Sequence, residues 1–164
     1  PYHDWLGKRL SPKRMGDQEA ALRCIAFVRC EPATDYKGSM DAFLNNTLQS
    51  LNEPKAESEH SALMGQFERV IIQLRDVLGE DAFRLPTTKT RGRLNLAVME
   101  SIYRVFAQHD ATWSARNRGQ LQANYRALLD NDKYRAAVSL ATSGVTRVRD
   151  RFRIAREILE VGCV

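Results

Sequence analysis

The sequence predicts an all-α fold, an irregular bundle of six or seven helices with mostly antiparallel neighbours. Apolar residues recur at helical spacing in most segments, and no segment alternates apolar and polar residues as a half-buried strand does. Residues that start and stop helices fall between these segments, and the connections are short, which favours antiparallel neighbours. A chain of 164 residues is long enough for a core of its own, so we treat residues 1–164 as a single helical domain.

Caps and helix breakers define the helices expected in the first half. Asp17 can cap a helix over residues 18–29, which a proline ends shortly afterwards. Ser39 opens a second helix over residues 39–51, closed by Asn-Glu-Pro. Apolar residues at helical spacing mark a third helix over residues 63–78, and the glycine that follows is a C-terminal signal.

Four more helices are expected in the second half. Residues 80–93 are rich in turn-forming and basic residues and form the one long loop that we expect. Apolar stripes then predict helices over residues 94–105, 121–128 and 134–138. The sequence Ala-Thr-Ser-Gly introduces the last helix, over residues 145–159.

The charge of the chain is divided unevenly along its length. The formal net charge is +5, but residues 1–83 hold 10 Lys and Arg against 13 Asp and Glu, whereas residues 84–164 hold 15 against 7. This asymmetry indicates an anionic partner for the second half. DNA is one such partner, and an acidic region of the same protein is another.

Motifs for catalysis or metal binding are absent from the sequence. Cys24, Cys30 and Cys163 form no metal-binding or redox pair, so we expect reduced thiols in a cytoplasmic protein. Gln108, His109 and Asp110 end the fourth expected helix, where a histidine favours the negative end of the helix dipole. Phosphate loops, nucleophile elbows and apolar runs of membrane-spanning length are also missing. We therefore expect no catalytic residue, metal or cofactor here, and no hydrolysis of nucleotides or DNA.

Two basic clusters are candidate contacts for DNA phosphates. In the last helix three arginines lie on one flank of the apolar stripe, with Arg147 and Arg151 on the other flank. The arginines of this helix can equally form a solvated rim, because their stems cover apolar surface while the charged groups stay in water. The second cluster flanks a glycine just before a helix start, which suits an anion. The candidates are Lys89, Arg91 and Arg93 in the loop, and Arg149, Arg153 and Arg156 in the last helix.

A cluster of four charged residues lies at the start of the first expected helix, and its pattern indicates a structural role. Glu19 precedes Arg23 by one helical turn in the favourable order, and Arg14 and Asp17 lie one turn earlier. On so apolar a helix Arg23 needs a fixed acidic partner, so we interpret the four residues as a structural latch that holds the helix against another part of the protein. We expect Arg23→Ala to destabilise the domain by about 2 to 4 kcal/mol.

Three blocks of the sequence resemble the helical C-terminal part of the GmrSD-type restriction endonuclease N-terminal-domain family. The first block is "RMGDQEAALRCIAF" followed by "DYKGSMDAFLNN", the second is "FRLPTTKTRGRLNLAVMESI", and "ATSGVTRVRDRF" is similar to the closing helix of the family. The matching residues are Arg14, Met15, Asp17, Glu19, Leu22, Arg23, Ala26, Phe27, Tyr36, Gly38, Asp41, Phe43 and Leu44, then Phe83, Arg84, Arg93, Asn95 and Ala97.

The resemblance implies a role in restriction or phage defence. Family members carry a ParB/sulfiredoxin-like first half linked to nucleotide binding and hydrolysis, and some add an HNH-type nuclease. This chain has neither the Gln-Gln pair of that half nor an HNH pattern, and its first residue is Pro1. We therefore expect a non-catalytic fragment that supports an N-terminal nucleotide-binding half and contacts DNA. The alternative is a purely structural or oligomerisation domain without nucleic-acid contact.

Overall fold

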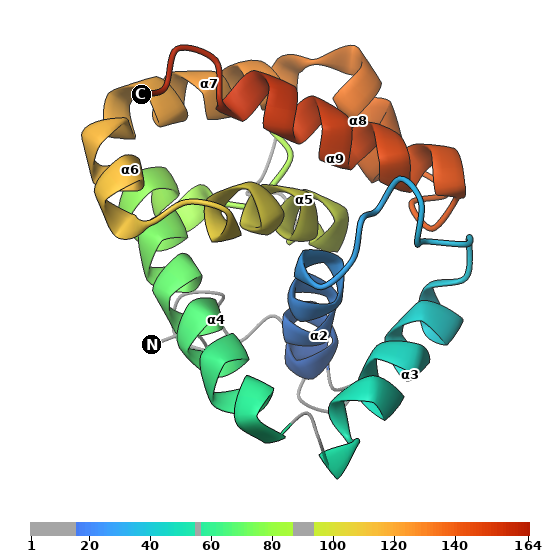
Figure 1. The fold of residues 1–164 in the computed structure, drawn as a ribbon. Coiled ribbons are helices and arrows are strands. Elements are labelled where there is room, and N and C mark those ends of the chain that lie inside the picture. Colours follow the sequence, from blue (N-terminus) through green and yellow to red (C-terminus); the bar gives the residue numbers. More distant parts are fainter. Residues whose placement is uncertain (1–15, 55–56, 87–93) are drawn as a thin grey trace.

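The computed structural model describes residues 16–54, 57–86 and 94–164, and these residues form an all-α domain (Figure 1). The described part contains eight α-helices and no strand, apart from one isolated bridge between Arg84 and Leu94. The predicted fold class is therefore confirmed. The helices are α2 (Gly16–Val28), α3 (Met40–Leu51), α4 (Glu57–Leu78), α5 (Leu96–Ala107), α6 (Ala111–Arg116), α7 (Arg118–Asp130), α8 (Asp132–Ser139) and α9 (Val145–Leu159), with a 3₁₀ turn at Gly79–Asp81.

Helix α5 lies at the centre of the domain. It packs against α2, α4 and α9, and α9 in turn packs against α7 and α8 (Figure 1). Its buried residues include the unbroken run from Ala97 to Tyr103, which covers every side of the helix. A helix that is apolar on all sides is stable only when neighbours cover it all round, so the composition of α5 itself requires the central position.

A smaller aromatic cluster joins α2, α3 and α9 at one end of the domain. The Phe27 ring centroid lies 4.6 Å from that of Phe152 and 4.8 Å from that of Phe43. Tyr36, in the connection between α2 and α3, packs against the same rings, and its hydroxyl donates to the Ser143 carbonyl at 2.6 Å. These contacts hold the α2–α3 connection against the start of α9.

Side-chain caps fix several helix starts, and one of them was predicted. The Ser39 hydroxyl accepts a hydrogen bond from the Ala42 amide at the start of α3, as expected. Asn95 and Asn131 cap α5 and α8 in the same way. At α2 the prediction was wrong, because the helix begins at Gly16 and the backbone of Asp17 already lies inside it.

The described part of the chain has more helices than the six or seven predicted. Helix α6 was missed because it has six residues, of which only Ser114 is buried, so it shows no apolar periodicity. Asp110 starts it by accepting a hydrogen bond from the Trp113 amide at 2.8 Å. Among the described helices, none combines the length and the hydropathy that a membrane span requires.

Candidate anion-binding site

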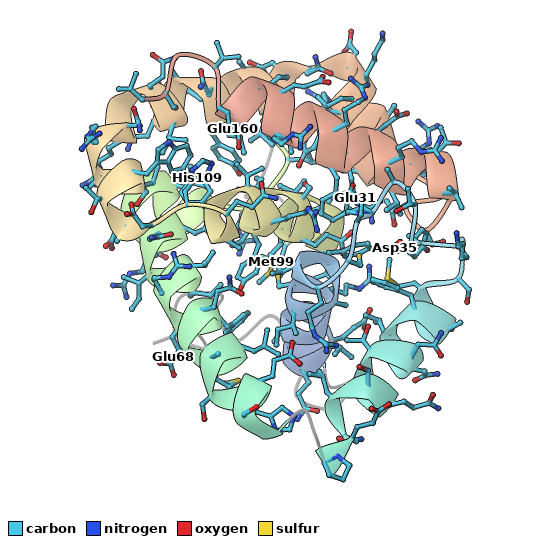
Figure 2. All side chains as sticks on the ribbon, viewed as in Figure 1. Glu31, Asp35, Glu68, Met99, His109 and Glu160 are labelled. Atoms are coloured by element: carbon cyan, nitrogen blue, oxygen red, sulfur yellow. The ribbon has the colours of Figure 1, made fainter. Side chains whose placement is uncertain are left out.

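The arginines predicted on the last helix line one hollow on the surface of the domain. The hollow has a volume of about 270 Å³ and lies between the α2–α3 connection, α5 and α9. Arg149, Arg153 and Arg156 come from α9, and Arg104 comes from α5. Figure 2 shows Glu31 where the connection leaves α2, close to α9. Four guanidinium groups and one carboxylate thus share a small concave surface.

Arg104 is the most firmly positioned cation of the hollow. Its Nη1 donates to the backbone carbonyls of Phe27 and Cys30, and its Nη2 donates to the Glu31 carboxylate at 3.1 Å. The last carbonyls of a helix have no partner within the helix, and they form the negative end of its dipole. Arg104 therefore donates hydrogen bonds to the backbone at the end of α2. It also places a positive charge in the lining of the hollow.

The three α9 arginines differ in how far their charge is already neutralised. Arg153 pairs with Glu157 at 2.7 Å and with Asp150 at 3.8 Å. Arg149 is exposed, and within the described part of the chain the acceptor to which it donates is the neutral Ala33 carbonyl, at 3.3 Å. Arg156 is exposed, and no carboxylate of the described residues pairs with it. Arg149 and Arg156 are therefore the two cations with donors available for an anion.

The side chains that line the hollow include four cations and few other polar groups. Of its lining residues, Ser101 carries the one hydroxyl, which is fully buried, donates to the Val98 carbonyl and lies 2.8 Å from the Tyr134 hydroxyl. The lining contains no cysteine or histidine. Within the described ranges, no group of His, Cys, Asp or Glu side chains is arranged to hold a metal ion.

The remaining predicted phosphate ligands cannot be placed on this surface. Lys89, Arg91 and Arg93 lie outside the described residues, as does Arg14. The side chain of Asp17 is also outside the description. Of the predicted latch, Glu19 and Arg23 can therefore be compared with the prediction.

Arg23 contacts two carboxylates of the chain. Its Nη2 lies 2.7 Å from Glu19, one turn earlier on α2, and its Nη1 lies 3.5 Å from Oε2 of Glu100 on α5. The side chain of Arg23 is 17% exposed, whereas that of Glu100 is 1% exposed. The buried acid that an arginine on this helix requires is thus supplied by α5.

A second arginine completes this buried charge group. Arg151 on α9 is fully buried, pairs with Oε1 of Glu100 and donates to the Thr142 carbonyl. Its guanidinium carbon lies 5.9 Å from the Phe27 ring centroid and 5.5 Å from that of Phe152, a cation–π arrangement. The prediction of a wet flank for Arg151 was wrong, because this flank of α9 packs against α5.

The cysteines of the described residues are free thiols with little nucleophilic character. Burial raises the pKa of Cys24 well above its ordinary value. Desolvation raises the pKa of Cys30 from 9.0 to about 11, although the nearby Arg104 opposes this shift. Since the thiolate is the reactive form, neither residue is suited to covalent catalysis at neutral pH.

His109 joins the turn after α5 to the end of α9. Its Nε2 lies 3.0 Å from the Glu160 carboxylate, and its ring stacks on that of Trp113 with centroids 3.8 Å apart (Figure 2). Helix α5 ends at Ala107, so His109 lies beyond the last turn rather than within it. These contacts connect the turn after α5 to α6 and to the end of α9.

Sequence reasoning missed Glu31, Glu100 and Arg104, and it misjudged the environment of Arg151. Arg104 and Glu100 lie on α5, and neither belongs to a recognisable motif. A signal for Glu100 exists: it is a single acid within an apolar helix, the same anomaly that singled out Arg23. Arg151 was recognised as an arginine beside the apolar stripe, but its burial was not.

The comparisons with known proteins give no relative: no protein-family model, curated protein or solved structure matches this chain. The fold and the site define an all-α domain with a basic hollow on one surface and an Arg–Glu–Arg group centred on Glu100 of its central helix.

Proposed function

We propose that this chain is the non-catalytic helical domain of a cytoplasmic, restriction-like defence protein, that it supports a nucleotide-binding half, and that it contacts DNA phosphates. The observation that carries the proposal is the convergence of Arg104, Arg149, Arg153 and Arg156 on one hollow. The resemblance of the sequence blocks to a restriction-associated family is the second support. Arginine suits this role because its planar group matches phosphate oxygens in a bidentate manner.

Arg149 and Arg156 carry the proposed DNA contact. They lie seven residues apart on α9, which corresponds to about 10 Å along the helix axis. Non-specific binding to duplex DNA at physiological salt has a Kd of roughly 10⁻⁴ to 10⁻⁶ M, and the logarithm of affinity falls with the logarithm of salt by about 0.9 per phosphate neutralised. We expect weak, salt-sensitive binding without sequence preference.

Fluorescence anisotropy with a labelled duplex at several salt concentrations tests this function. The double variant Arg149→Gln, Arg156→Gln should lower the salt slope by about two units. Arg153→Gln should change it less, because two carboxylates already neutralise Arg153. Arg126→Gln on α7 is a matched control, since Arg126 is exposed but does not line the hollow. Replacing Lys89, Arg91 and Arg93 together should lower the slope by about two to three units if all three contact phosphate.

The alternative is a structural or oligomerisation domain whose basic surface meets an acidic protein partner. One observation favours it: the Glu31 carboxylate already binds Arg104, as a carboxylate of such a partner would. If this alternative holds, the fluorescence anisotropy of the labelled duplex does not change when the protein is added, at any salt concentration. The same arginine substitutions would then weaken self-association or association with the nucleotide-binding half, measured by analytical ultracentrifugation.

A further inference from the structure

We infer that the hollow is a discrete site for one compact phosphate dianion, with Glu31 as a built-in competitor at its edge. This inference rests on the proposed function in that it assigns the α9 arginines to phosphate. It goes further because it proposes that one phosphate group binds inside the hollow, instead of several duplex phosphates contacting arginines along α9.

The size of the hollow fits a small anion. At roughly 30 Å³ per water molecule, a phosphate group with two or three times the volume of water occupies about 60 to 90 Å³. The hollow of about 270 Å³ therefore has ample room for one phosphate or pyrophosphate together with its hydrating water. A duplex is a convex rod, so its backbone can lie across such a hollow but cannot enter it.

The charges of the hollow match a dianion. Glu31 neutralises Arg104, and two carboxylates neutralise Arg153. Arg149 and Arg156 are the two lining arginines that no carboxylate of the described residues pairs with, so their charges face the hollow without a counter-charge. A charge of −2 at the mouth of the hollow balances them, and charge-assisted N–H···O bonds to phosphate are the strong class of hydrogen bond.

Glu31 is placed to compete with such an anion. Its Oε2 accepts from Arg104 and its Oε1 accepts from the Ala33 amide at 3.4 Å, so the carboxylate is held at the edge of the hollow. Its own amide donates to Asp35 at 2.7 Å, which fixes the turn (Figure 2). The side chain is 59% exposed, so it can turn toward solvent when a phosphate takes its place on Arg104.

Isothermal titration calorimetry with sodium pyrophosphate, at low ionic strength and on the full chain, tests the inference. We expect binding of one pyrophosphate per chain, weakened about tenfold by each of Arg149→Gln and Arg156→Gln and unchanged by Arg126→Gln. Glu31→Gln keeps the shape of the side chain and removes its charge. A single charge at about 6 Å in water corresponds to roughly tenfold in affinity for a dianion, so Glu31→Gln should strengthen the binding of pyrophosphate, which carries at least two negative charges near neutral pH, by about tenfold or more. Far-UV circular dichroism checks that each variant is folded.

A second pair of titrations distinguishes the source of the phosphate. A single-stranded oligonucleotide with a 5′-phosphate is compared with the same strand ending in a 5′-hydroxyl. Tighter binding of the phosphorylated strand, lost in Arg156→Gln, indicates a strand end, whereas equal binding of both strands with retained pyrophosphate binding indicates a free phosphate compound. Either result supports the site.

The inference and the proposed function fail in different ways. If duplex binding depends on Arg149 and Arg156 but pyrophosphate binds no more tightly to the wild type than to their double variant, the discrete site is refuted while the DNA contact stands. If pyrophosphate binds as expected but the duplex does not, the DNA contact is refuted and the site stands. Weaker or unchanged pyrophosphate binding by Glu31→Gln would overturn the assignment of Glu31 as a competitor.

Discussion

Removing the charge of Glu100 should be the most damaging conservative substitution in the buried charge group. Glu100 is 1% exposed and lies between two arginines, of which Arg151 is fully buried and Arg23 is 17% exposed. Glu100→Gln keeps the size of the side chain and one oxygen acceptor. It leaves Arg151 without a counterion in an environment where desolvation is costly.

The expected loss follows from the burial of this pair. Breaking a buried ion pair by removing one partner typically costs about 3 to 5 kcal/mol. For a domain of this size each kcal/mol corresponds to a shift in Tm of about 2 to 4 °C, so Glu100→Gln should lower the Tm by roughly 6 to 20 °C. Glu68→Gln, at an exposed position of α4, is the matched control and should stay within about 0.5 kcal/mol of the wild type.

Thermal and urea denaturation followed by circular dichroism measure these differences. The double variant Glu100→Gln, Arg151→Met should recover part of the loss, because it removes the uncompensated cation together with the missing acid. Equal midpoints for Glu100→Gln and Glu68→Gln would refute the reasoning. So would a double variant whose loss is the plain sum of the two single losses, since coupled partners are not additive.

Three further predictions concern Arg23, Gly38 and Cys30. Arg23→Ala should lower the free energy of unfolding by about 1 to 2 kcal/mol, at or below the lower end of the range expected from sequence, because Glu100 remains paired with Arg151. A loss as large as that of Glu100→Gln in urea denaturation would contradict this. Gly38→Ala should destabilise the domain by about 1 kcal/mol or more, because Gly38 has φ of 97° and a Cβ there would lie 3.2 Å from Val145; an unchanged urea midpoint would argue against it. At pH 8, Cys30 should react with a disulfide reagent about tenfold more slowly than a thiol of ordinary pKa, because its pKa of about 11 lowers the thiolate population more than it raises the nucleophilicity of the thiolate. A rate equal to the ordinary one, measured on a Cys24→Ala, Cys163→Ala background, would show that the thiol is not desolvated.

Much of the secondary structure is determined by local sequence. A serine at 39 caps α3 because its hydroxyl reaches an amide three residues later, and this needs no information from the rest of the chain. The apolar stripes of α4, α5, α7 and α9 follow from the helical period in the same way. Helix α6 has no stripe and was therefore missed.

The sequence also placed Arg149, Arg153 and Arg156 on one flank of α9, because residues three and four apart on a helix are neighbours. It did not determine what faces that flank. Arg104 reaches the hollow from α5, whose position beside α9 depends on the packing of both helices with the rest of the core. Contacts over such separations follow from which helices pack together, and the periodicity of a single helix carries no information about them.

The same distinction separates Arg147 from Arg151. The helical period assigns both to one flank of α9, yet Arg147 is half-buried and Arg151 is fully buried. What the sequence by itself determined is that this chain forms apolar helices with arginines beside the stripes. Only the tertiary structure decided that one arginine is buried against Glu100 and the aromatic cluster while others stay exposed around a hollow. The physical reason is that the energy of a charge depends on its burial and on its nearest counter-charge, and both are set by neighbouring helices.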